Sequence, residues 1–117
     1  MTRTILSAAC AAAFALALAA PASAQSFSCS AATKPDEKAV CDSRALANLD
    51  VKNATLYQVA TSLVAMGERG NLQDQETAFL KKRAACGASV SCIQAAYEAN
   101  IAAIQSVLDG IYKNGPY

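Results

Sequence analysis

The chain contains no histidine. Because a thiol nucleophile ordinarily needs an imidazole as its base, this absence argues against cysteine-based catalysis. The sequence also lacks a glycine-rich phosphate loop and a pair of carboxylates at a recognisable cleft position. We therefore expect a protein that is not an enzyme and that holds no cofactor or metal ion.

Residues 1–24 have the pattern of a cleaved signal peptide. Arg3 precedes an apolar run, Ile5–Ala20, and the small residues at 22–24 fit a cleavage site. A membrane anchor is the alternative, but this run is shorter than the ~20 residues that a spanning helix needs. We expect cleavage before Gln25 and a periplasmic or secreted protein. No later apolar stretch is long enough to insert into a membrane.

Neither sign of charge is in excess after the predicted cleavage. The whole chain has 10 basic and 9 acidic residues, and the only charged residue of the predicted signal is Arg3. Residues 25–117 are therefore neutral overall. This balance argues against nucleic acid or an anionic lipid surface as the partner.

Four cysteines remain after the predicted cleavage, which also removes Cys10. In an oxidising compartment such cysteines ordinarily form disulfides. Their spacings lack the tight C-x2-C pairs that zinc sites and redox enzymes use. We therefore expect two structural disulfides among Cys29, Cys41, Cys86 and Cys92.

These four cysteines allow three pairings. On a continuous helix, Cys86 and Cys92 would lie about 9 Å apart along the axis, farther than the ~5.5 Å between the Cα atoms of a disulfide. Gly87 interrupts the helix between them, so the chain can fold back there. Loop-closure entropy does not decide the pairing, because the cross-pairings close longer loops. We favour Cys29–Cys41 and Cys86–Cys92 because each joins consecutive cysteines.

Apolar residues recur at helical spacing, and no segment alternates with the period of a strand. We expect four helices, at residues 34–41, 43–66, 72–85 and 89–112. Asp36 and Glu37 suit the start of the first helix, where carboxylates complement the helix dipole. Ser43 and Ser89 can cap the second and fourth helices. The predicted turns fall at Gly67 with Gly70, and at Gly87, which suits a left-handed conformation.

The second and fourth helices have the longest apolar stripes. In the second helix the stripe is interrupted by Asn53, which is either a register-setting polar residue or an ordinary satisfied one. In the fourth helix it comprises Ile93, Tyr97, Ile101, Ile104, Leu108 and Ile111. The expected fold is therefore all-α: a small three- to four-helix antiparallel domain, packed around the second and fourth helices and stapled by two disulfides.

A specific order of residues links the two cysteine pairs. It comprises Phe27, Cys29, Glu37, Cys41, Leu49, Asp50, Tyr57, Gln75, Phe79, Leu80, Arg83, Cys86, Cys92, Tyr97 and Ile101. This order resembles the LprI-type lysozyme-inhibitor domain family of exported bacterial proteins and covers nearly all of residues 25–117. The chain departs from that pattern at Phe79, where the family usually has tryptophan, and at Asn100, where it commonly has arginine.

The resemblance implies a small helical domain with disulfide-bonded cysteines. It also implies an exported interaction protein that inhibits a lysozyme by occluding the cleft of the enzyme. The alternative is an envelope protein without inhibitory activity, either structural or a stress-related binding module. The expected partner is accordingly a lysozyme or another envelope protein.

Four polar residues beside the apolar stripes are the candidate interaction or structural residues: Asp50, Gln75, Lys82 and Arg83. One interpretation makes them a contact surface for a partner, and Lys81-Lys82-Arg83 could then face an acidic lysozyme cleft. The other makes them polar links between helices. Our specific hypothesis is that Asp50 and Arg83 pair between the second and third helices.

Overall fold

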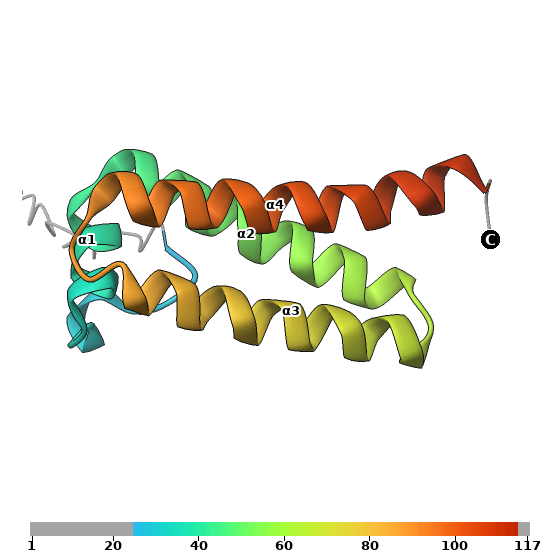
Figure 1. Cartoon of the computed structure of the whole chain (residues 1–117), viewed down its shortest axis with the longest axis horizontal. Helices are drawn as coiled ribbons and strands as arrows, with labels where there is room; N and C mark the ends of the chain where they lie inside the picture. Colours follow the sequence, from blue (N-terminus) through green and yellow to red (C-terminus); the bar gives the residue numbers. More distant parts are fainter. Residues whose placement is uncertain (1–24, 115–117) are drawn as a thin grey trace, which may run out of the picture.

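Residues 25–114 are described by the computed structural model and form one short turn and four helices (Figure 1). These elements are η1 (Cys29–Ala31), α1 (Pro35–Asp42), α2 (Arg44–Leu63), α3 (Met66–Ala85) and α4 (Val90–Lys113). The predicted all-α class is confirmed, since this part of the chain contains no strand. None of its helices is both long enough and apolar enough to cross a membrane. The predicted signal peptide, residues 1–24, lies outside the described residues.

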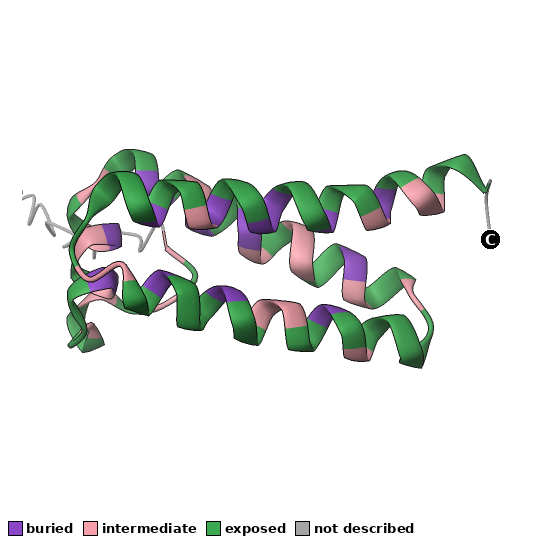
Figure 2. Ribbon diagram, viewed as in Figure 1, coloured by how far each residue is buried: buried purple, intermediate pink, exposed green. Residues whose placement is uncertain are grey.

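Helix α4 packs against both other long helices because its apolar stripe is the longest in the chain. The inward side of α4 is buried against both α2 and α3, and its outward side is exposed (Figure 2). The short connection after α3 makes α3 and α4 antiparallel neighbours (Figure 1). The predicted packing around the second and fourth helices is found, because α2 and α4 share the most extensive helix contact.

The hydrophobic core runs along the bundle in two connected parts. At the α1 end, the buried side chains are Val40, Leu46, Phe79, Ile93, Tyr97 and Ile101. At the other end they are Ala60, Leu72, Ile104 and Leu108. Leu56 packs against both parts, so a single continuous core holds all the helices together.

The third helix begins earlier than the sequence predicted. Gly67 and Gly70 lie inside α3, and the connection from α2 is instead at Val64 and Ala65. Arg69 explains how so short a connection is held. Its Nε donates to the carbonyl of Thr61 (2.8 Å) and its Nη2 to that of Val64 (3.2 Å). These bonds satisfy carbonyl groups that the end of a helix leaves unpaired.

Both predicted disulfides are present. The Cα atoms are 5.8 Å apart in Cys29–Cys41 and 5.6 Å apart in Cys86–Cys92. Gly87 has a φ of 57°, the left-handed conformation predicted for the end of the third helix. The first bridge ties the N-terminal segment to α1, and the second closes the connection between α3 and α4.

Candidate functional site

A buried polar cluster joins all four helices at the α1 end of the bundle. We call it the arginine cluster; its members are Asp36, Asp50, Arg83, Tyr97 and the partly covering Ser26. The four helical members are almost fully buried, with exposed fractions of 1%, 3%, 7% and 0%, respectively. Each comes from a different helix, from α1 to α4.

The guanidinium of Arg83 connects the two carboxylates. Its Nε donates to Asp36 at 2.8 Å, and its Nη1 donates to the Tyr97 hydroxyl at 3.0 Å. That hydroxyl in turn donates to Asp50 at 2.8 Å. The predicted pairing of Asp50 with Arg83 is present as a 3.9 Å ion pair, but the closer partners of Arg83 are Asp36 and Tyr97.

The N-terminal segment completes this cluster. The backbone N–H of Ser26 donates to one oxygen of Asp50, and its hydroxyl donates to the other at 3.0 Å. The ring of Phe27 lies 5.5 Å from Cζ of Arg83, and the ring of Phe79 lies 6.0 Å away. Two carboxylates face one guanidinium, so neutral donors from Ser26 and Tyr97 stabilise the remaining negative charge.

The chemistry of the arginine cluster is that of a structural link. Burial, followed by the charge of Asp50, raises the pKa of the Tyr97 hydroxyl, so this group stays protonated and serves as a donor. Every buried polar side-chain atom in residues 25–114 has a hydrogen-bond partner. A substrate would find no unused group here, and the exposed fractions leave no path to it.

A second polar group, the amide cluster, crosses the middle of the bundle and comprises Asn53, Gln75, Glu76 and Asn100. Asn53 donates to Glu76 at 2.9 Å, and Asn100 donates to both Asn53 and Glu76 at 2.8 Å. The side-chain amide of Gln75 donates to the side-chain oxygen Oδ1 of Asn100 at 2.9 Å. Asn53 is therefore a satisfied polar residue that links α2 to α3 and α4.

Glu76 is the acidic member of the amide cluster. Burial is the largest influence on this carboxyl and raises its pKa, while hydrogen bonds from Asn100 and Asn53 oppose the shift. The group is half-buried, and the polar atoms nearest to it are neutral amides. The charged form is consequently disfavoured relative to a carboxylate in water.

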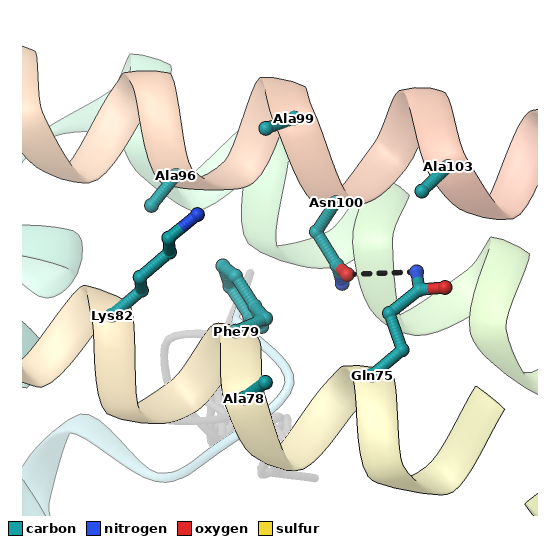
Figure 3. A pocket seen from close by; sticks show the side chains of 8 residues that line it. All are labelled: Gln75, Ala78, Phe79, Lys82, Ala96, Ala99, Asn100 and Ala103. Atoms are coloured by element: carbon teal, nitrogen blue, oxygen red, sulfur yellow. Dashed lines mark hydrogen bonds between the residues drawn. The ribbon is translucent and has the colours of Figure 1, made fainter. Parts of the chain in front are cut away.

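An accessible hollow opens over the amide cluster, between α3 and α4 (Figure 3). We call it the α3–α4 groove. Its volume is about 230 Å³, and it is lined by Gln75, Ala78, Phe79, Lys82, Ala96, Ala99, Asn100 and Ala103. An adjoining hollow of about 270 Å³ shares Lys82, Ala96 and Ala99 with it and extends to the Cys86–Cys92 bridge. The walls are mostly methyl groups, with polar groups at a few points.

Lys82 and Gln75 provide the accessible polar groups of the groove. The Lys82 side chain extends across the groove toward Ala96, and the Gln75 amide lies near Asn100 (Figure 3). Lys82 is exposed and forms no ion pair with any residue in the described range. Lys81, its neighbour in the sequence, does not line the groove.

The four predicted site residues thus separate into two places. Asp50 and Arg83 lie together in the arginine cluster, whereas Gln75 and Lys82 lie on the α3–α4 groove. Sequence reasoning missed Asp36, which was interpreted as an acid that complements the dipole of α1. It also missed Ser26 and Glu76, because their partners are 24 and 23 residues away in the sequence.

Another hollow lies between α1 and the connection that precedes α4. It has a volume of about 470 Å³ and is lined by Thr33, Pro35, Lys38, Ala39, Asp42, Ser43, Ala88 and Val90. Its lining includes one basic residue, Lys38, and one acidic residue, Asp42, so it favours neither cationic nor anionic ligands. Among residues 25–114, no group of histidine, cysteine or acidic side chains is placed to hold a metal ion.

Comparisons of this chain with protein-family models, with curated proteins and with solved structures find no match.

Proposed function

We propose that this chain is an exported interaction protein that binds its partner through the α3–α4 groove and does no catalysis. The observation that carries the proposal is the contrast between its polar sites. The arginine cluster is sealed and fully satisfied, whereas the groove presents the ammonium of Lys82, which has no ion-pair partner within residues 25–114, in an accessible, methyl-lined hollow. Such a surface suits recognition, where a few polar groups fix orientation on an otherwise apolar contact.

A lysozyme is the partner that the family resemblance implies. The cleft of a lysozyme carries two carboxyl groups, and the ammonium of Lys82 has the complementary charge. On this proposal the protein covers the cleft and excludes the cell-wall substrate. The second candidate is a non-inhibitory envelope protein that uses the same groove for another partner, and the position of Lys82 supports it equally.

An inhibition assay separates these candidates. The exported, oxidised chain is added in large molar excess to lysozymes of several structural types, acting on cell-wall substrate. Inhibition of at least one type is expected, with Lys82→Glu abolishing it and Lys81→Glu leaving it intact. The two lysines are adjacent in α3 and both exposed, so the pair isolates the groove from general charge. If no lysozyme type is slowed, the inhibitor proposal is wrong.

A further inference from the structure

Two rows of side chains border the α3–α4 groove with the spacing of a helical bundle seam. Among the lining residues of α3, Gln75, Phe79, Lys82 and Cys86 form one row; among those of α4, Cys92, Ala96, Ala99 and Ala103 form the other. Ala78, Ala95 and Asn100 line the hollows beside these rows. Both rows advance by four, three and four residues, which is the alternation that brings a and d positions to a packing surface. Two antiparallel helices with parallel seams of this kind form half of a four-helix packing site.

Within the described chain only one side of α3 and α4 is covered. Helix α2 packs against both from the inner side, with Phe79 and Asn100 closing the floor of the groove. The outer side is the hollow of Figure 3. Its α4 wall consists mainly of alanine methyl groups, so another helix can approach at the 8–10 Å axial separation of packed helices.

The polar groups of the groove indicate what that helix must carry. Lys82 is the only charged residue that lines either hollow, and it is unpaired within residues 25–114. Gln75 lies two helical turns away on the same row, about 10.5 Å along the axis. A carboxylate on the occupant can pair with Lys82. A hydrogen-bonding side chain one heptad from it can then reach Gln75.

We propose that the α3–α4 groove binds an α-helix of a partner protein, with an Asp or Glu opposite Lys82 and an amide or hydroxyl side chain one heptad away opposite Gln75. This inference rests on the proposed function in that it uses the same groove. A groove-to-groove dimer would not fulfil it, because no acidic residue lines the groove. The proposed occupant is therefore a helix of a different protein, bound in the helix-in-groove mode, and a second copy of this chain that presents another helix face is an outcome the test below decides.

A displayed library of helical peptides tests this directly. The apolar face of the peptides is randomised, and selection is made on the exported, oxidised chain. Selected peptides should be rich in Asp or Glu at one position and in Asn, Gln, Ser or Thr seven residues away. Their affinity should fall roughly tenfold with Lys82→Glu and recover when the peptide acid is changed to lysine. A proline in the centre of the peptide should abolish binding.

Two alanines supply the matched control. Ala103 lines the groove, whereas Ala102 is exposed on α4 and does not. Ala103→Arg should block the selected peptides, and Ala102→Arg should not, at equal melting temperatures. Selected peptides without acidic enrichment, or indifferent to Ala103→Arg, would overturn the proposal. Self-association of the chain that Ala103→Arg removes would also overturn it, in favour of a second copy.

The two proposals fail separately. If the peptides bind as described while no lysozyme is inhibited, the helix-binding groove stands and the lysozyme assignment falls. If a lysozyme is inhibited through Lys82 but no helical peptide is selected at the groove, the binding function stands and its helical occupant is wrong.

Discussion

Arg83 is the residue on which the buried polar contacts converge. Changing Arg83 to alanine leaves Asp36 and Asp50 buried without their cation. We expect the free energy of unfolding to fall by about 3–5 kcal/mol, as it does when one partner of a buried ion pair is removed. Urea unfolding measures the loss.

The neighbouring lysine is the control for that substitution. Lys82→Ala removes a cation from the same turn of α3 but from an exposed position, so its effect should stay within about 0.5 kcal/mol. Equal stability of the Arg83→Ala and Lys82→Ala variants would mean that the arginine cluster contributes nothing to the fold.

The raised pKa of the Glu76 carboxyl predicts that the stability of the fold depends on pH. Because burial raises its pKa above the ordinary 4.5, the folded chain binds this proton more tightly than the unfolded chain. The stabilisation from that proton is present at low pH and is lost as pH rises through the folded-state pKa. The stability difference between wild type and Glu76→Gln should therefore grow in favour of wild type as pH falls from about 7 toward 5.

Guanidinium unfolding at a series of pH values tests this sign. Glu37→Gln is the matched substitution of opposite sign, because backbone hydrogen bonds from Lys34 and Thr33 lower the pKa of the Glu37 carboxyl. Its difference from wild type should shrink on acidification, since a lowered folded-state pKa contributes stability that is lost as pH falls. A Glu76→Gln difference that shrinks on acidification would contradict the raised pKa.

At the scale of single residues, the sequence predicted one contact of the arginine cluster, between Asp50 and Arg83, but not the contact of Arg83 with Asp36. The positions of Asp50 and Arg83 at stripe edges predicted their proximity, which is observed. Asp36 looked like a routine helix-start acid, and nothing local shows that it points inward. Its bond to Arg83 spans 47 residues, so only the angle between α1 and α3 creates it.

At the scale of the helices, replacing glycine by alanine should have opposite effects inside α3 and directly after its C-terminal end. Gly67 and Gly70 lie within helix, and an added Cβ would have no atom within 4 Å. Alanine at either position should stabilise the chain by roughly 0.5–1 kcal/mol. Gly87 has a positive φ, so Gly87→Ala should destabilise it by about 1–2 kcal/mol.

Thermal or urea unfolding of the three glycine variants measures these changes in stability.

The sequence suggested a turn at Gly67 and Gly70 because glycine commonly interrupts helices. The observed connection at Val64 and Ala65 contains neither glycine nor proline. It is held by the side chain of Arg69, a tertiary contact with no local signature. By contrast, the apolar period, with Ser89 taken as the start, predicted α4 to within about a residue at each end.

The two disulfides are expected to differ in importance. Replacing both cysteines of Cys86–Cys92 by serine should cost roughly 2 kcal/mol, the loop-closure contribution of a short bridge. Replacing those of Cys29–Cys41 should cost more than the ~3 kcal/mol of its own loop, because it also releases the segment that brings Ser26 to Asp50. Equal losses in urea unfolding would show that the N-terminal segment adds no stability.

The whole molecule should unfold as one unit. The two parts of the core share Leu56, and the arginine and amide clusters connect helices that are distant in the sequence. Thermal transitions followed by tyrosine near-ultraviolet and backbone far-ultraviolet circular dichroism should therefore coincide. Separate transitions for the two signals would show that side-chain packing is lost before the helices unfold, and would contradict unfolding in one step.

The ends of the described chain differ in how they can be used. Ser26 and Phe27 hold the N-terminal segment against Asp50 and Arg83, whereas α4 ends at the opposite extremity of the bundle (Figure 1). A tag or fluorophore attached at Gln25 would crowd the buried cluster. Attachment beyond Lys113 leaves both that cluster and Lys82 unobstructed, so surface immobilisation for partner screening belongs at the C-terminal side.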